Sequence, residues 1–386
     1  MNKEMLDKAV DRFRSLLEEQ IRRKEQMERS RKDAKVCKDT ITIGLADGDG
    51  IGPIIMQTAE AVLKELVSEE IRQGTVRLKR IEGLTLENRE KTGEAVPKDV
   101  LKEIRECDVL LKGPTTTPKG GSLESANVCL RRELDLFANV RPVKIPSMGI
   151  DWTFFRENTE GEYVLGSRGV CPDDGLVVDF KVTTVPGTER IARAAFEYAG
   201  RNGKTNVAIV TKANIMKKTD GLFSEICHKV AKDYPEIRVE DWYVDIMAAN
   251  LVDEKQRSRF QVFLLPNLYG DILTDEAAQI QGGVGTAGSA NIGERHAMFE
   301  AIHGTGLRMF EEKREQYASP VSILRALIML LYHIGLTEKA DRLDRVLTEL
   351  EEAGADYAVT GYPDGLTCAA YGEALLDRLC RERFSD

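Results

Sequence analysis

The stretch ITIGLADGDGIGPIIMQTAEAVLKELV, residues 41–67, predicts the fold class of this 386-residue chain. Residues 41–50 are typical of a strand that runs into a glycine-rich turn, and residues 52–67 are typical of the helix that follows it. Strands that alternate with amphipathic helices indicate an α/β fold with a largely parallel sheet. The same alternation returns in the strands predicted at VRLKRIEG (76–83), CDVLLKGPTTTP (107–118), TNVAIVTKAN (205–214), IRVEDWYVD (237–245) and FQVFLLPNLYGD (260–271), and in a helix predicted over 217–233.

Length and composition exclude several classes of protein. The chain is long enough for two lobes, and 42% hydrophobic with 31% charged residues is typical of a globular protein. A net charge of −9 and a pI of about 5.3 argue against a nucleic-acid or acidic-membrane partner. No apolar run approaches the length of a membrane helix. Seven scattered cysteines without a metal-binding spacing favour reduced thiols, and we expect a cytoplasmic location.

Two helical segments stand apart from this alternation. Residues 1–38 are dense in Glu, Lys and Arg, with Phe13, Leu16, Leu17 and Ile21 at helical spacing. They predict a solvated or interface-seeking helix without a catalytic role. Near the other end, SILRALIMLLYHIG (322–335) is apolar on several faces and predicts a buried or subunit-interface helix.

The stretch GGVGTAG (282–288) contains the spacing G-x-G-x-x-G of a Rossmann dinucleotide-binding loop. Such a loop needs a strand immediately before it and a helix that starts on the third glycine. Residues 271–280 instead predict a helix, and residues 289–301 lack the apolar periodicity of a dinucleotide-binding helix. The spacing therefore does not indicate a Rossmann domain.

A pair of carboxylates just before this loop is a candidate metal site. Asp271 and Asp275 are four residues apart, so on a helix both project from one face. Mg²⁺ takes one or two carboxylates and leaves positions for substrate oxygens. A third carboxylate, Asp245, lies at the end of a predicted strand. The alternative is structural, with Asp271 as a helix N-cap and Asp275 as a solvated residue.

A second set of residues is suited to an anionic substrate. Ser125, Asn127 and Arg131 begin a predicted helix, Arg141 follows the next extended segment, and Arg156 opens RENTEGEY. Arg binds carboxylates bidentately, although scattered surface arginines are the alternative. Two further polar residues, Tyr163 and Lys212, lie where an α/β enzyme keeps a general acid or base.

Six motifs in this order resemble the isocitrate/isopropylmalate dehydrogenases, which are metal- and NAD(P)-dependent β-decarboxylating enzymes. They are GDGIGP (48–53), FANVRP (137–142), RENTEGEY (156–163), PNLYGDILTDEAA (266–278), GSANIG (288–293) and HGTG (303–306). The resemblance covers Thr40 to the C-terminus and implies a two-domain fold with a mixed sheet, not a Rossmann fold. It implies a large cofactor-binding domain of residues 39–136 and 282–386, after the N-terminal extension 1–38. It also implies a small domain, 137–281, with a dimer-interface clasp at about 161–185.

The resemblance also implies roles for single residues. In this family Arg131, Arg141 and Arg156 match the arginines that hold the substrate carboxylates. Asp271 and Asp275 match the ligands of Mg²⁺ or Mn²⁺, and Tyr163 matches the catalytic tyrosine that protonates the product enolate. The neighbouring subunit of a homodimer donates the residues that match Asp245, a further metal ligand, and Lys212, the catalytic lysine.

The expected reaction is oxidative decarboxylation of isocitrate to 2-oxoglutarate and CO₂, because Ser125 and Asn127 match residues of the isocitrate enzymes. Homoisocitrate and 3-isopropylmalate are alternative substrates, and a catalytically silent regulatory subunit is an alternative role. For the cofactor, Arg308 stands at the position that discriminates NADP from NAD and favours NADP. Against NADP, Ser319 replaces an adenine-contacting Asn. Other residues that match the cofactor site are Thr116, Thr117, His303, Gly304, Thr305 and Gly306, the last in place of the usual Ala.

Overall fold

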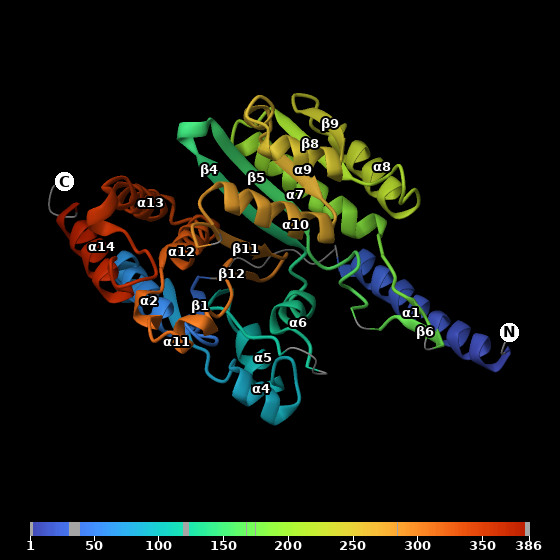
Figure 1. Ribbon diagram of the computed structural model, residues 1–386, viewed down its shortest axis with the longest axis horizontal. Helices are drawn as coiled ribbons and strands as arrows, with labels where there is room; N and C mark the ends of the chain where they lie inside the picture. The colour runs from blue at the N-terminus through green and yellow to red at the C-terminus, as the bar shows by residue number, and fades with distance from the viewer. Residues whose placement is uncertain are drawn as a thin grey trace. The chain divides into compact units, whose positions relative to one another are not determined.

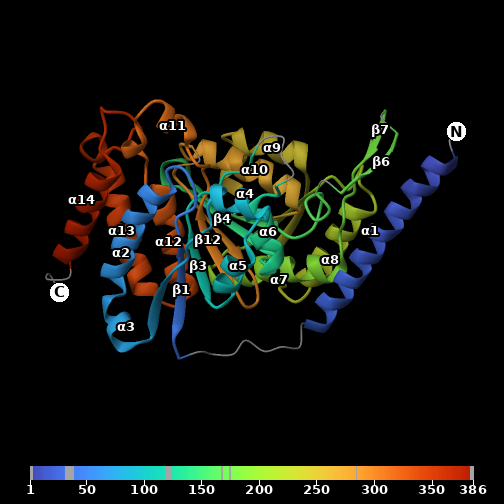
Figure 2. The same ribbon diagram turned by 90° about the horizontal axis from the view of Figure 1, so that it is seen from below.

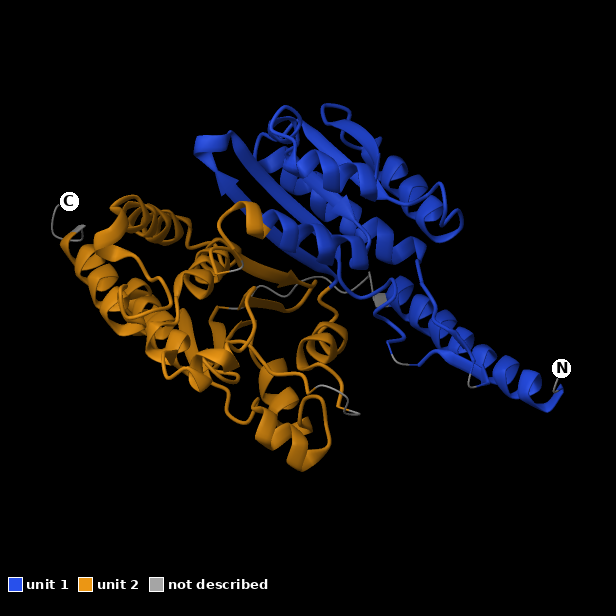
Figure 3. Cartoon of the chain, in the orientation of Figure 1, with its two compact units in different colours: residues 1–36, 137–277 blue, residues 37–136, 278–386 orange. Residues whose placement is uncertain are grey.

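A computed structural model describes residues 3–30, 39–118, 123–166, 168–173, 175–283 and 285–382. The chain divides into two compact units (Figure 3): unit 1 comprises residues 1–36 and 137–277, and unit 2 comprises residues 37–136 and 278–386. Residues 31–38 of the predicted extension and Val284 of the GGVGTAG stretch lie outside the described residues.

Unit 2 is built on a mixed sheet, as the family resemblance predicts (Figure 1). Its strands lie in the order β2-β1-β3-β12-β11. The first four run parallel, and β11 is antiparallel to β12. The bounds are β1 Ile41–Ala46, β2 Val76–Arg80, β3 Val109–Lys112, β11 Gly288–Ile292 and β12 Ala297–Ala301. The predictions of strands in 41–50, 76–83 and 107–118 are confirmed.

Helices pack on this sheet and build the core of unit 2. Helix α12 packs on β3, β11 and β12, and nine of its 13 residues are buried, so the prediction of a buried helix at 322–335 is confirmed. It also contacts α2 and α13, and α14 contacts both of those helices. A second core contains side chains of α5 and α6 together with β3 and β12. The bounds are α2 Gly52–Leu66, α3 Ser68–Gln73, α4 Leu86–Thr92, α5 Lys98–Arg105, α6 Ala126–Glu133, α11 Leu307–Glu311, α12 Val321–His333, α13 Thr337–Glu352 and α14 Cys368–Glu382.

Unit 1 contains strands in the order β4-β5-β10-β8-β9, of which only β4 is antiparallel to its neighbour. Aromatic rings fill its core: Phe154 of β5 stacks on Phe263 of β10 with ring centroids 4.3 Å apart. Helices α7 and α8 pack against each other and on the sheet. The bounds are β4 Ala138–Ile145, β5 Ile150–Glu157, β8 Asn206–Thr211, β9 Arg238–Tyr243, β10 Val262–Leu265, α7 Val185–Arg201, α8 Thr219–Ala231, α9 Val244–Val252 and α10 Asn267–Ile280.

Two local predictions need correction. Arg141 lies inside β4 rather than after an extended segment, because the strand continues to Ile145. Asp271 is not an N-cap, because α10 already begins at Asn267 and places Asp271 in its second turn. The rejection of the Rossmann loop is confirmed, since GGVGTAG follows helix α10 and precedes strand β11.

The N-terminal helix α1, Lys3–Ser30, runs along the short strand β6, Val170–Asp173, which pairs with β7, Leu176–Val178 (Figure 2). Leu16 is buried on this side in a cluster with Leu165 and Val170. The helix is therefore not solvated all round, although Leu6, Val10, Phe13, Leu17 and Ile21 are exposed. Among the described residues, no helix is both long and apolar enough to cross a membrane.

Candidate active-site residues

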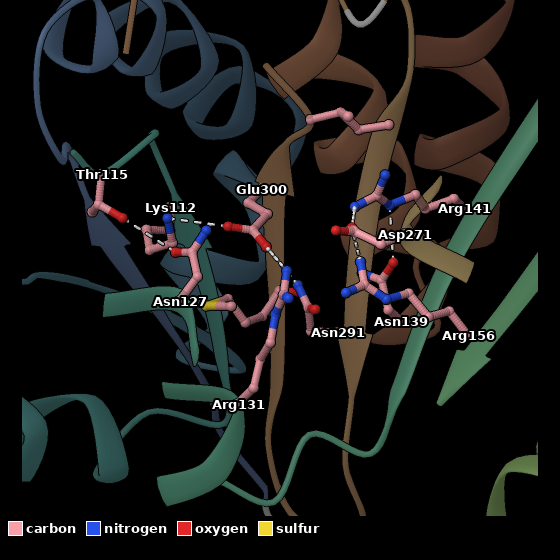
Figure 4. A network of polar contacts seen from close by, with 12 residues as sticks. Lys112, Thr115, Asn127, Arg131, Asn139, Arg141, Arg156, Asp271, Asn291 and Glu300 are labelled. Atoms are coloured by element: carbon pink, nitrogen blue, oxygen red, sulfur yellow. Dashed lines mark hydrogen bonds and ion pairs between the residues drawn. The ribbon is translucent and has the colours of Figure 1, made fainter. Parts of the chain in front are cut away.

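The predicted carboxylate pair meets two of the predicted arginines in unit 1, and Figure 4 shows Asp271 beside Arg141 and Arg156. Arg141 donates to Asp275 at 2.8 Å, and its Nη2 lies 3.8 Å from Asp271. Arg156 donates to the same Asp271 oxygen. The arginine side chains are 8% and 1% exposed, whereas those of Asp271 and Asp275 are 38% and 60% exposed. The arginines are thus fixed in the protein, and the carboxylates are accessible to a ligand.

Neighbouring polar groups fix the two arginines. Arg141 donates to Asn139 on its own strand at 2.9 Å and to Thr274 of α10 at 2.8 Å. Arg156 donates twice to the Asn267 side chain, at 3.0 and 2.7 Å. Both guanidinium groups therefore have a neutral partner in addition to a carboxylate.

Gly270 explains why α10 can approach Arg156 so closely. A Cβ atom at this position would lie 2.6 Å from Cβ of Arg156. Any larger residue in the motif PNLYGD would force Arg156 or the helix to move.

Tyr163 belongs to the same cluster. Its hydroxyl donates to Asp271 Oδ2 at 2.8 Å, and the Arg156 guanidinium carbon lies 5.4 Å from the centroid of its ring. The structure thus brings four predicted residues of unit 1 together around Asp271. They are Arg141, Arg156, Tyr163 and Asp275.

Lys212 and Asp245 form a separate pair in unit 1. Lys212 follows β8, and its Nζ lies 2.6 Å from Asp245 in the first turn of α9. This hydrogen bond lowers the pKa of Asp245. The backbone N–H of Lys212 donates at 2.7 Å to Asp220, which is completely buried. Within the described ranges, no three Asp, Glu, His or Cys side chains lie close enough to hold a metal, so Asp245 does not join Asp271 and Asp275 in one chain.

In unit 2, Arg131 belongs to a buried charged cluster (Figure 4). Glu300 Oε1 accepts from Arg131 at 3.3 Å and from Asn291 at 2.9 Å, and Lys112 Nζ lies 3.1 Å from Glu300 Oε2. Burial alone would raise the pKa of Glu300, but the charges of Lys112 and Arg131 lower it to about 2. Glu300 is therefore ionised and fixes both cations.

Ser125 and Asn127 lie at the start of α6, whose last turn carries Arg131. Ser125 is the N-cap residue, yet its side chain accepts no hydrogen bond from the helix backbone. The Asn127 side chain accepts from the Thr115 hydroxyl at 3.2 Å. Helix α6 and its N-cap residue therefore carry all three predicted substrate residues of unit 2.

Two motifs of the predicted cofactor site, GPTTTP and HGTG, meet the family motif GDGIGP in unit 2. The Thr116 backbone N–H donates to Asp49 at 2.8 Å, and its hydroxyl donates to that of Thr305 at 3.3 Å. The Ile51 backbone N–H donates to the Thr305 carbonyl at 3.0 Å. These bonds join GDGIGP, GPTTTP and HGTG.

Gly306 adopts a φ of +61°, in the left-handed region that favours glycine. Gly306 is therefore compatible with this turn, whereas the Ala expected from the family would be strained in it. A Cβ atom here would also lie 3.0 Å from the Ile51 side chain.

The other predicted cofactor residues differ in their surroundings. Arg308 is highly exposed and forms an ion pair of 2.6 Å with Glu312. His303 has a buried Nε2 without a hydrogen-bond partner among the described residues, and burial lowers its pKa. Ser319 accepts from the Val321 backbone N–H at 3.4 Å, and Thr117 is exposed. The roles of all these residues stay predictions.

Several residues of these clusters escaped the sequence analysis. Lys112 ends an apolar strand, and a charged residue at that position was an available signal. Asn267 and Thr274 gave no signal, because only tertiary contacts bring them to the arginines. Arg314 is a further case, because it donates to Glu312, the ion-pair partner of Arg308, and to the Gly361 carbonyl at 2.8 Å.

The sequence and the structure were compared with known proteins, and the matches belong to one family. A family model described as isocitrate/isopropylmalate dehydrogenase matches residues 42–375. The NADP isocitrate dehydrogenase of Rickettsia bellii is 38% identical over 319 residues, which are 81% of this chain but only 63% of that relative's length. The mitochondrial NAD isocitrate dehydrogenase regulatory subunit 3 of Arabidopsis thaliana is 38% identical over 323 residues, covering 81% of this chain and 83% of that protein. The crystal structure of isocitrate dehydrogenase from Methylococcus capsulatus has a TM-score of 0.78 and 36% identity, covering 88% of this chain and 99% of that chain.

Proposed function

Because the chain belongs to the isocitrate/isopropylmalate dehydrogenase family of decarboxylating dehydrogenases, we propose that it oxidises and decarboxylates isocitrate to 2-oxoglutarate and CO₂. The hydride acceptor in this proposal is NADP.

The observation that carries the choice of substrate is the polar start of α6. Isocitrate differs from 3-isopropylmalate in bearing a third carboxylate where the other acid has an isopropyl group. A carboxylate calls for hydrogen-bond donors, and Ser125 offers a hydroxyl that does not cap its own helix. Asn127 and Arg131, four residues apart on α6, add an amide and a cation. Homoisocitrate stays the nearest alternative, because one methylene group is weakly discriminated.

Asp271 and Asp275 would hold the divalent cation. Two exposed carboxylates on one helix face are the oxygen donors that Mg²⁺ and Mn²⁺ prefer. Asp245 from a second subunit would be the third ligand, since it does not reach this pair within the chain. When bound, the cation would withdraw electron density from the substrate oxygens and ease proton loss from the hydroxyl.

The charges of unit 1 support coupled binding of cation and substrate. Arg141 and Arg156 pair with Asp271 and Asp275, so these four charges cancel. A cation on the two carboxylates would leave the two guanidinium groups available for substrate carboxylates, which they bind bidentately. Arg131, fixed by Glu300, would bind a further carboxylate.

Proton transfer is assigned to two residues. Lys212, from the second subunit, would accept the proton of the substrate hydroxyl as hydride leaves the carbon that bears this hydroxyl. Tyr163 would donate a proton to the carbon left electron-rich by loss of CO₂. The Tyr163 hydroxyl already lies against Asp271, which supports this assignment. Because Lys212 and Asp245 would act across an interface, the proposed enzyme is at least a homodimer.

The choice of NADP depends on Arg308. Its partner Glu312 lies in an exposed ion pair, and a 2′-phosphate could replace such a partner. NAD is the alternative cofactor. A silent regulatory subunit is the alternative role, and the names of two Arabidopsis thaliana relatives describe them as regulatory subunits. The presence of Tyr163, Lys212 and all three aspartates supports a catalytic role.

A single assay tests the proposal. Purified protein with Mg²⁺ receives isocitrate, homoisocitrate or 3-isopropylmalate, each with NADP and with NAD, and the absorbance of the reduced cofactor is followed. We expect the highest kcat/KM with isocitrate and NADP. A preference for 3-isopropylmalate would contradict the role of Ser125 and Asn127. Absence of turnover with every pairing would contradict the catalytic role.

A further inference from the structure

The loop that carries the proposed catalytic tyrosine begins with an acidic turn, residues 157–160. Glu157 accepts from the Thr159 backbone N–H at 2.9 Å and hydroxyl at 2.8 Å, and from the Glu160 backbone N–H at 2.6 Å. Glu160 accepts from Thr184, the N-cap of α7, through its hydroxyl at 2.5 Å and its backbone N–H at 2.8 Å. Both carboxyl groups are buried. Buried acidic groups so close together need nearby cations to stay in place.

The N-terminal helix supplies one of these cations. Arg23 of α1 lies 3.3 Å from Glu160 Oε1 and donates to the Thr159 carbonyl at 3.1 Å and hydroxyl at 3.3 Å. Its side chain is 21% exposed and that of Glu160 is 3% exposed. The other cation at the turn, Arg190 of α7, donates to the Thr159 hydroxyl at 2.9 Å. Arg23 lies before residue 42, where the match to the family model begins.

Two more contacts hold α1 over this loop. Glu19 accepts from Arg168 at 2.7 Å, on the far side of Tyr163 in the sequence. Leu16 packs with Leu165 and Val170. The helix therefore contacts the chain on both sides of residues 161–164.

The turn is connected to the substrate arginine in two ways, by the peptide bond between Arg156 and Glu157 and by the side chain of Asn267. Asn267 donates to the Glu160 carbonyl at 3.1 Å and accepts both bonds from Arg156. A shift of the turn would therefore move Asn267, and with it the guanidinium group that contacts Asp271.

We propose that α1 is a positioning element of the active site, in which Arg23 holds the turn 157–160 and thereby fixes Arg156 and Tyr163 for the substrate. The N-terminal extension then sets the affinity for the acid substrate without contacting it. The consequence for catalysis rests on the proposed function, whereas the effect on the loop does not.

The test compares Arg23→Gln with Arg22→Gln in the full-length protein. Arg22 is the neighbouring residue on α1, and its side chain is 71% exposed and has Glu18 as its polar partner in the described structure. We expect Arg23→Gln to raise the KM for isocitrate roughly tenfold while the KM for NADP changes less than about twofold, because misplaced positioning groups weaken substrate binding selectively. Arg23→Lys keeps the positive charge, so its KM for isocitrate should return most of the way to the wild-type value. Equal kinetics for Arg23→Gln and Arg22→Gln would overturn the proposal, as would a parallel rise of both KM values.

Amide hydrogen exchange provides a readout that does not depend on turnover. Residues 157–163 should exchange at least several-fold faster in Arg23→Gln than in Arg22→Gln, with unchanged exchange in β8 and β10. If no acid is turned over by any variant, the proposed function fails but exchange still decides the role of Arg23. If Arg23→Gln does not fold, Arg23→Met, which keeps the length of the side chain without its charge, replaces it, and wild-type exchange in 157–163 of that variant overturns the proposal.

Discussion

At the scale of the residue, the most informative feature is the pairing of arginines with carboxylates. Arg141 and Arg156 are buried and held by Asn139 and Asn267, so they need no movement to receive an anion. Their carboxylate partner Asp271 also accepts from Tyr163. A single carboxylate thus contacts three groups of the proposed chemistry.

Replacing Asp271 should abolish turnover without unfolding the protein. Loss of a group that only supports a metal ligand lowers metal affinity or activity about 10–100-fold. Loss of a ligand itself should have a larger effect, so Asp271→Asn should lower kcat/KM by more than about 100-fold. Arg156 keeps its two bonds to Asn267, and the thermal midpoint should therefore change little. Glu276→Gln on the same helix is the matched control and should keep near-normal activity. Near-normal turnover of Asp271→Asn would contradict the metal assignment.

The acidic turn predicts a pH dependence of stability. Burial and the neighbouring charge of Glu160 raise the pKa of Glu157 to about 7. A raised pKa in the folded state favours folding below the unfolded pKa of about 4.3, and this contribution is lost as pH rises towards 7. The Glu157→Gln variant has no carboxyl group at this position and therefore does not lose this contribution. The free energy of unfolding of the variant minus that of the wild type should increase between pH 5 and 7.5. Denaturant unfolding at several pH values measures this slope, and a flat or decreasing difference would contradict it.

At the scale of the element, the turn 303–306 contains Gly306 where the family resemblance predicts Ala, and the local conformation favours this glycine. The left-handed Gly306 directs the chain from Thr305 into α11, and the carbonyl of Thr305 accepts from Ile51 in the turn before α2. An Ala at position 306 would suffer backbone strain and also crowd Ile51.

Gly306→Ala should therefore destabilise the protein by about 1–2 kcal/mol, the usual cost of a left-handed conformation for a residue with a Cβ. Gly304→Ala is the control, because no atom lies within 4 Å of the Cβ it would add. That variant should stay within about 0.5 kcal/mol of wild type. Free energies of unfolding in urea decide the comparison, and equal values for both variants would show that the turn tolerates a Cβ at residue 306.

At the scale of the whole molecule, the proposed site is incomplete in one chain. Lys212 and Asp245 form their own ion pair, and the described residues hold no three-carboxylate metal group. Two copies related by a twofold axis could each supply this pair to the other.

Complementation tests this sharing. Lys212→Gln and Asp271→Asn chains with different tags are co-expressed, and the heterodimer is purified through both tags. If Lys212 acts across the interface, one of the two sites in the heterodimer is intact and activity should be about half of wild type. Each variant alone should be nearly inactive. An inactive heterodimer would show that Lys212 acts within its own chain.

The sequence by itself predicted the α/β class, the strands β1, β2, β3, β8, β9 and β10, the buried helix at 322–335 and the family. These follow from local periodicity and from motifs of a few residues, which are visible without tertiary contacts. It also identified Asp271 and Asp275 as residues on one helix face, because helical spacing alone determines that relation.

Only the tertiary structure decided which side chains neutralise one another. Glu300 meets Lys112 because β12 lies beside β3 in a register that places these two residues opposite each other. Arg23 meets Glu160 across a separation of 137 residues. Strand order and helix packing arise from the burial of the whole apolar surface, so local patterns do not encode such pairs. For the same physical reason, the sequence marked α1 only as a charged helix, and the packing of Leu16 placed Arg23 on the acidic turn.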